Sequence, residues 1–180
     1  PYAWYALFLL ALANMFNYID RHIVSALSPA IKADLNLDDA DLGFLIGTAF
    51  AVLYGVLGIS MGRIADALSR TKLMSSGLAL WSVMTALSGA ATGFGSLSAA
   101  RLGVGVGEAT ANPVSQSMIS DYFPARNRGA VLGVYLASVH LGNAAALIIG
   151  GLFLANWNTF CDVFPAGACG VADWRAAFMI

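Results

Sequence analysis

Two acids and two arginines stand inside long apolar stretches of this chain. They are Asp20 and Arg21 in one stretch, and Arg101 and Glu108 in another. A charged side chain at the centre of a bilayer costs about 2.5–3.5 kcal/mol or more, so such groups face a cavity or a partner and mark a pathway. Two carboxylates near two guanidiniums offer titratable acids and a site for an anionic group. This combination is what a proton-coupled carrier needs.

Amides accompany these charges at helical spacing. Asn17 precedes Arg21 by four residues, with Asp20 on the flank of the same stripe, and Asn112 follows Glu108 by four. Residues spaced in this way share one face of a helix, so the two polar faces predict the walls of a shared aqueous cavity. The candidates for proton coupling are Asp20 and Glu108, and those for substrate binding are Arg21, Arg101, Asn17 and Asn112.

A structural interpretation competes with this one. The four charges could form a buried ion-pair network that only fixes helix packing, with Asp20 paired to Arg101 or Arg21 paired to Glu108. Glycines at 103, 105 and 107 precede Glu108 and predict that a substrate or another backbone comes close there. Pro113, five residues beyond Glu108, predicts a bend with a freed carbonyl.

The composition excludes several classes of protein. Hydrophobic residues make up 59% of the 180 positions and charged residues only 11%, whereas soluble domains carry about 25% charged residues. The net charge of -1 gives no electrostatic basis for binding nucleic acid. We expect no metal or cofactor, because phosphate-loop and zinc-type spacings are absent from the sequence. An enzyme acting on lipids would need a nucleophile beside a base, and no such pairing is evident.

Apolar segments recur at about the 20 residues needed to cross a bilayer. They predict an all-helical membrane protein with one membrane domain. Five segments are full spans, and a sixth begins near the end of the sequence, which looks cut there. The predicted spans are 2–33, 41–62, 73–93, 97–120, 130–157 and 173 onward.

The charges in the connecting loops predict the orientation. Basic residues gather in the loops after the second and fourth spans, whereas the alternate loops are mainly acidic. The positive-inside rule therefore places the N-terminus and both basic loops in the cytoplasm. Cys161 and Cys169 then fall in an outer loop, where a disulfide could persist, although two unrelated small residues remain the alternative.

Two motifs resemble those of the major facilitator superfamily, and the resemblance covers essentially the whole chain. Residues 62–72, GRIADALSRTK, are similar to its signature between helices two and three, and residues 101–109, RLGVGVGEA, to its helix-four signature. The first departs from the usual pattern at Ala67 and Ser69. The resemblance implies a conformational role for four residues of this loop: Gly62, Asp66, Arg70 and Lys72.

Within that superfamily, three segments look most like the spinster group of lysolipid and sphingolipid transporters. They are NYIDR at 17–21, GEA at 107–109 and DYFPARNRG at 121–129. This resemblance implies a proton-coupled carrier of an amphipathic anionic lipid, such as a lysophospholipid or sphingosine phosphate, working by alternating access. Anion:cation symporters share very similar elements, so a small organic anion is the alternative substrate. Drug:proton antiporters fit less well, because Ala146 and Leu147 replace their central Gly-Pro.

The resemblance also implies an architecture of twelve helices. Residues 1–180 would form the N-terminal bundle, built from two inverted three-helix repeats with the sixth helix incomplete, and the C-terminal bundle would lie outside this sequence. The expected partners are the substrate, protons, membrane lipids and that second half. The expected location is the plasma membrane or a bacterial inner membrane, with the N-terminus cytoplasmic.

Overall fold

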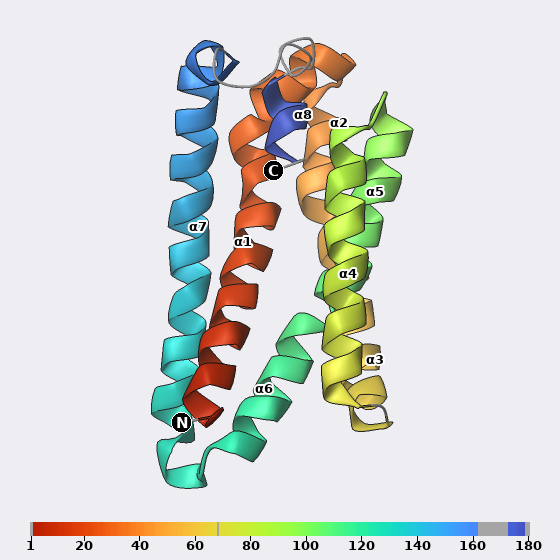
Figure 1. The fold of residues 1–180 in the computed structure, drawn as a ribbon. Helices are drawn as coiled ribbons and strands as arrows, with labels where there is room; N and C mark the ends of the chain where they lie inside the picture. The colour runs from red at the N-terminus through yellow and green to blue at the C-terminus, as the bar shows by residue number, and fades with distance from the viewer. Residues whose placement is uncertain (1, 68, 162–172, 179–180) are drawn as a thin grey trace.

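The structure is a computed structural model that describes residues 2–67, 69–161 and 173–178. At 48–50, 53, 59, 62–63, 65–67, 157–161 and 173 it describes the backbone alone. Among the described residues the regular secondary structure is entirely helical, as the sequence predicts. The chain runs up and down a bundle of long helices (Figure 1).

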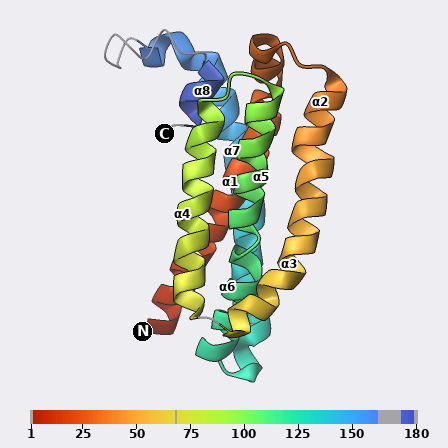
Figure 2. The same cartoon turned by 90° about the vertical axis from the view of Figure 1, so that its right-hand side faces the viewer.

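The first half of the bundle begins with α1, the long helix Tyr2–Leu35. The chain then returns through α2 (Asp39–Gly43), a π-helical segment (Phe44–Thr48) and α3 (Ala49–Ala67), which follow one another without a gap. The helix α4, Arg70–Gly89, completes this half. In Figure 2, α2 and α3 form one continuous descending rod to the side of the others.

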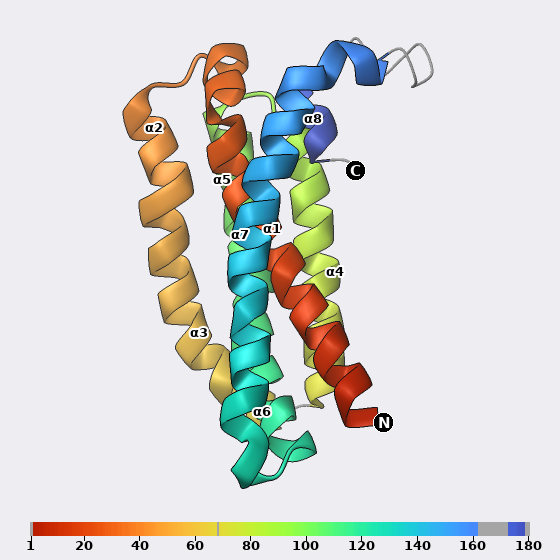
Figure 3. The same cartoon turned by 90° about the vertical axis from the view of Figure 1, so that its left-hand side faces the viewer.

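The second half begins with α5 (Phe94–Glu108) and continues in α6 (Ala111–Tyr122). The long helix α7 (Ala125–Cys161) follows, with a non-helical residue at Asn156, and α8 covers Asp173–Ala177. Figure 3 shows α7 lying along α1. Each predicted span therefore corresponds to helix, although the fourth is split. By length and composition, α1 and the Ala125–Asn156 part of α7 are sufficient to cross a membrane.

The ends of the bundle follow the alternation predicted from the loop charges. The N-terminus, the α3–α4 connection and the α6–α7 connection lie together at one end (Figure 1). The α1–α2 and α4–α5 connections lie at the opposite end. The two basic loops consequently share an end, which is the arrangement that the positive-inside rule requires.

A proline lies within α1 without interrupting it. Pro29 has no N–H to donate to the carbonyl of Ser25, four residues earlier. The Ser28 hydroxyl donates to that carbonyl instead, at 2.9 Å. Local replacement of this kind lets a membrane helix contain proline, because no water is available there to bond a freed carbonyl. The helix ends before Asn36, whose φ of 55° lies in the left-handed region that Asn tolerates.

The predicted fourth span, 97–120, is two helices instead of one. The break falls at Ala109 and Thr110, directly after Glu108. Pro113 explains its position, because proline removes the hydrogen bond to the carbonyl four residues earlier, which is that of Ala109. The predicted bend therefore exists, but it lies three to four residues before the proline and next to the acid.

The helices α4 and α5 touch closely where Glu108 is held. A side chain added at Gly107 would meet the carbonyl oxygen of Gly77 at 2.7 Å and the Cβ of Trp81 at 2.8 Å. The sequence left two possibilities open for the approach at this glycine, and the structure shows that it is another backbone. Contact at this distance is available only to glycine.

At the end of the bundle opposite the N-terminus, α8 is tied to α1 and α4. The Arg175 guanidinium donates to Asp34 at 2.9 Å and to the carbonyl of Ala91, and the Trp174 indole also donates to Asp34 at 3.1 Å. Trp174 is fully buried with Leu27 of α1 in an apolar cluster. These contacts fix the start of α8 against the first and third passes of the chain.

Candidate functional site

Arg21 of α1 reaches across the bundle to Glu108, the last residue of α5. Its Nη2 donates to the Glu108 Oε2 at 2.9 Å. The guanidinium lies 4.6 Å from the centre of the Tyr54 ring and 5.1 Å from that of Tyr18. These distances are within the range of cation–π attraction. Arg21 is thus held by a carboxylate and two aromatic faces.

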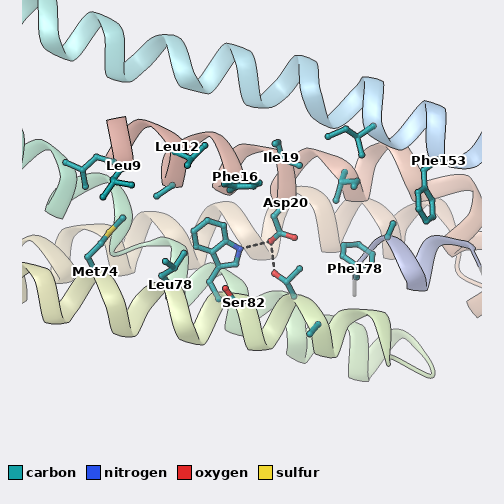
Figure 4. A pocket seen from close by; sticks show the side chains of 18 residues that line it. Leu9, Leu12, Phe16, Ile19, Asp20, Met74, Leu78, Ser82, Phe153 and Phe178 are labelled. Carbon is teal, nitrogen blue, oxygen red and sulfur yellow. Dashed lines mark hydrogen bonds between the residues drawn. The ribbon is translucent and has the colours of Figure 1, made fainter. Parts of the chain in front are cut away.

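Asp20, the preceding residue, faces a different group of helices. Its Oδ2 accepts hydrogen bonds from the Trp81 indole at 3.2 Å and the Thr85 hydroxyl at 2.9 Å, both from α4 (Figure 4). Arg101 of α5 lies 3.5 Å from the Asp20 Oδ1 and donates to its backbone carbonyl at 3.1 Å. Asp20 and Arg101 are both buried.

Both pairings that the sequence suggested are therefore present: Asp20 with Arg101, and Arg21 with Glu108. Consecutive residues of a helix project about 100° apart, which is why Asp20 and Arg21 meet different partners. Both pairs join α1 to α5, so the two polar faces meet in direct contacts. The contacts neutralise the four charges pairwise, which is compatible with the carrier and with the purely structural interpretation.

Asn112, the second residue after the helix break, joins two tyrosines. Its Nδ2 donates to the Tyr54 hydroxyl of α3 at 2.7 Å, and its Oδ1 accepts from the Tyr135 hydroxyl of α7 at 3.0 Å. Because Tyr54 also stacks on Arg21, this chain of hydrogen bonds extends to the Arg21–Glu108 pair. Both polar atoms of the Asn112 amide are therefore bonded to tyrosines in this structure.

Asn17 and Asn14 line the same side of α1 and are almost completely buried, at 2% and 1% exposure. Asn14 donates to the Ser138 hydroxyl of α7 at 2.9 Å. Among the described residues, the buried atoms that lack a hydrogen-bond partner include Asn17 Nδ2, Asn14 Oδ1 and Glu108 Oε1. Buried polar atoms are normally bonded, so these three indicate a place for water or a ligand.

A separate, apolar groove opens on the other side of α1. It has a volume of about 920 Å³ and lies between α1, α4, α7 and α8 (Figure 4). Asp20 is its one charged lining residue, among side chains such as Phe16, Leu78 and Phe153. Ala177 and Phe178 of the last described segment also line it.

The predicted conformational loop connects α3 with α4. Arg70, the first residue of α4, forms an ion pair with Asp121 near the end of α6. Lys72 is exposed in the same turn of helix. Gly62 and Asp66 belong to α3, but the Asp66 side chain lies outside the described part. The pair ties the α3–α4 connection to the α6–α7 connection at the end of the bundle that carries the N-terminus.

The predicted disulfide extends beyond the described part of the chain. Cys161 is the last residue of α7, and Cys169 lies outside the described residues. Among the described residues, no cluster of His, Cys, Asp or Glu could hold a metal ion.

Sequence reasoning missed four side chains of the site. Trp81 and Thr85 bind Asp20, and Tyr54 and Tyr135 bind Asn112. Trp81 and Thr85 are four residues apart, so a hydrogen-bonding face on the third span could have been noticed. The two tyrosines gave no comparable signal, because an isolated tyrosine in an apolar span is also a common packing residue.

Charged pairs from the first and fourth passes inside a helical bundle are compatible with a membrane transporter. The family comparison agrees: residues 10–180 match the Major Facilitator Superfamily, and the chain belongs to that family. It is accordingly an integral membrane protein of a transporter class.

Among curated relatives, an MFS-type efflux pump of Mycolicibacterium smegmatis is 36% identical over 99% of this chain and 38% of its own length. Protein spinster of Drosophila melanogaster is 30% identical over 90% of this chain and 27% of its own. A probable L-galactonate transporter of Escherichia coli is 30% identical over 85% and 34%. The chain thus spans less than two fifths of the length of each of these relatives.

A solved structure is also similar. A bacterial homolog of the human lysosomal transporter spinster, in an inward-facing and unoccupied conformation, superposes with a TM-score of 0.87. It is 33% identical, and the match covers 99% of this chain and 40% of that one. The expected resemblance to the spinster group is confirmed.

Proposed function

We propose that this chain is the N-terminal half of a proton-coupled secondary transporter that carries an amphipathic anionic lipid by alternating access. The lipid would be of the lysophospholipid or sphingosine phosphate type. The observation that carries the proposal is the pair of buried acid–guanidinium contacts, Asp20 with Arg101 and Arg21 with Glu108. The similarity to spinster proteins supports the lipid class.

The two pairs would have different roles in transport. Arg21 keeps 21% of its side chain exposed while Glu108 has none exposed, so an anionic head group reaches the arginine first. An anion that binds Arg21 competes with Glu108 for the guanidinium, and the released carboxylate then favours a proton. Arg101 is exposed by only 6%, so we assign it to a later stage of the cycle, after Asp20 takes its own proton.

We further propose that residues 1–180 form one bundle of two inverted repeats. The first would be α1, the α2–α3 pass and α4, and the second the α5–α6 pass, α7 and the helix begun by α8. The apolar groove lined by Phe16, Leu78 and Phe178 would then receive the continuation of that sixth helix, since Ala177 of α8 already lines it. The C-terminal bundle would provide the facing wall of the transport pathway.

The location and orientation follow from the charges. We propose a plasma membrane or bacterial inner membrane, with the N-terminus and both basic connections in the cytoplasm. The Arg70–Asp121 pair would then hold the cytoplasmic ends of α4 and α6 together. Gly62, Asp66 and Lys72 would complete a loop that makes and breaks contacts as the two halves rock.

A small organic anion is the second candidate substrate. The observation that favours it is the set of amides and hydroxyls beside Arg21, including Asn17, Asn112, Tyr54 and Tyr135. Polar groups of this kind suit a hydrophilic solute better than an acyl chain. The similarity to the probable L-galactonate transporter supports the same class.

The deciding experiment is uptake into proteoliposomes by the full-length transporter. Labelled lysophospholipid and labelled galactonate would each be offered with and without an imposed pH gradient. The proposal expects gradient-stimulated uptake of the lipid, and the second candidate expects it for galactonate. Uptake of neither under any gradient would remove both.

A further inference from the structure

A ring of contacts from four passes of the chain surrounds the inner side of α1. Asn14 of α1 bonds Ser138 of α7. One turn away on α7, Tyr135 bonds Asn112 of α6, which bonds Tyr54 of α3, and the Tyr54 ring faces Arg21 back on α1. On α1, Asn17 lies between the two ends of this ring. These four contacts join α1 to α3, α6 and α7 in a polar region next to the Arg21–Glu108 pair.

Residues of this region carry buried polar atoms without hydrogen-bond partners, and these atoms include both donors and acceptors. In the described structure, Asn17 Nδ2 is a donor without an acceptor, whereas Asn14 Oδ1 and Glu108 Oε1 are acceptors without a donor. Exposure of these residues is 2%, 1% and 0%, so bulk water does not serve them. A bound group that both donates and accepts would satisfy this mixture. A hydroxyl has that property, and an alkyl chain has neither function.

The position of Asn17 on α1 places this polar region close to the proposed anion site at Arg21. Asn17 and Arg21 are four residues apart, so they lie on one face of α1 about 6 Å apart along its axis. A molecule whose charged group binds Arg21 would therefore bring an atom a few bonds further along its chain to Asn17. The substrate chemistry that fits is an anion with a hydroxyl close to the charge.

We propose that Asn17, assisted by Asn14, forms a subsite for a hydroxyl group near the anionic group of the substrate. The inference rests on the proposed transport of an anion that binds Arg21, and it adds a selection rule. Both a glycerol-based lipid head and a free hydroxy acid satisfy this rule. An anion of equal charge and length without the hydroxyl leaves the buried amides unpaired and binds more weakly.

Two matched pairs of probes test the rule on the full-length transporter. The first pair is galactonate and hexanoate, which share a carboxylate and six carbons. The second is lysophosphatidic acid and the same phosphate without its glycerol hydroxyl. For the pair that binds, we expect the hydroxylated member to have a Kd at least tenfold lower, measured by isothermal titration in detergent. Which pair binds identifies the source of the hydroxyl.

Variants then assign the preference to Asn17. In Asn17→Leu the Kd of the probe without the hydroxyl, divided by that of the hydroxylated probe, should fall to about one. The reason is weaker binding of the hydroxylated probe. Asn17→Ala, which removes volume, should give the same ratio if Asn17→Leu does not fold. Asn127→Leu is the matched control, since Asn127 is exposed at the end of the bundle, and it should keep the wild-type ratio.

The outcomes separate the inference from the function that it rests on. Equal affinity of the wild type for both members of a pair overturns the inference and leaves anion transport standing. In that case water, and not a hydroxyl of the substrate, would bond the buried amides. A preference that persists unchanged in both Asn17 variants also overturns it. If none of the four anions binds the wild type, the inference and the proposed function fall together.

Discussion

The Glu108 side chain is completely buried, whereas that of Arg21, which binds it at 2.9 Å, keeps 21% of its surface exposed. The arginine therefore lies between the acid and the solvent. Removing one member of a buried pair leaves the other uncompensated, at a cost of about 3–5 kcal/mol. Replacing both members with apolar residues avoids that cost. Comparing single with double variants of this pair therefore distinguishes an effect on stability from an effect on transport.

We first predict that Glu108→Gln and Asp20→Asn each lose gradient-driven transport while the protein still folds. Both substitutions keep the shape and much of the hydrogen bonding but remove titration. Transport rate in proteoliposomes under an imposed pH gradient is the measurement. Asp39→Asn, at the exposed start of α2, is the control and should behave as the wild type. Wild-type gradient dependence in both carboxyl variants would return the four charges to a structural role.

Arg21→Ala should lower the thermal stability of the purified protein and abolish anion binding. The double variant Arg21→Met with Glu108→Met should recover most of the stability, since no charge is then left unpaired. It should remain unable to bind the anion. Thermal unfolding in detergent and titration with the substrate distinguish the two effects. A double variant that binds the anion normally would exclude Arg21 from the binding site.

Gly107→Ala should destabilise the bundle by about 1–3 kcal/mol, the usual cost of forcing extra volume into a packed contact. The added methyl would meet the Gly77 carbonyl and the Trp81 side chain. Gly133→Ala is the control, because a side chain there meets no atom within 4 Å. It should be neutral or slightly stabilising, since alanine favours helix. Equal melting temperatures for both variants would contradict the close contact.

The orientation is tested by labelling single cysteines. In a background with Cys161→Ser and Cys169→Ser, cysteines at Lys72 and Asn127 should react with an impermeant thiol reagent only from the cytoplasmic side. Lys72 and Asn127 are exposed, so the reagent can reach both. A cysteine at Asp39, at the opposite end of the bundle, should react only from outside. Reaction of Lys72 and Asn127 from outside would invert the topology.

The disulfide remains a prediction of the sequence. Peptide mapping of the native protein without reductant should show Cys161 linked to Cys169. Two free thiols in that experiment would remove the bridge and would leave the transporter proposal unaffected.

The sequence predicted the charged centre better than its surroundings, for a physical reason. A charge in an apolar span has a high free-energy cost unless it is compensated. Arg21 and Glu108 could therefore be recognised from the sequence, together with the kind of partner that each needs. Tyr54 and Trp81 carry no such cost when they only pack, and their hydrogen bonds depend on how α3 and α4 are rotated. Rotation is a tertiary property, set by contacts such as that of Gly107 with Gly77.

The division of the fourth span has a similar explanation. The hydropathy of residues 97–120 predicts one continuous span, because Ala109 and Thr110 are compatible with a membrane helix. The break depends on the carbonyl that Pro113 leaves without a donor, and its place follows only from counting four residues back. The sequence predicted a bend there but not that it would begin directly after Glu108.

Asp20 and Arg21 are opposite charges at adjacent positions, and this adjacency restricts the rotational setting of α1. Turning the helix by one residue, about 100°, would bring Arg21 to the direction now occupied by Asp20, towards Arg101. The Asp20–Arg101 and Arg21–Glu108 attractions would then be lost, and the guanidiniums of Arg21 and Arg101 would repel each other. The protein interior screens charges poorly, so this repulsion would be strong. The two charges thus select one packing arrangement of α1 over its rotated alternatives, a contribution to folding specificity that is independent of any substrate.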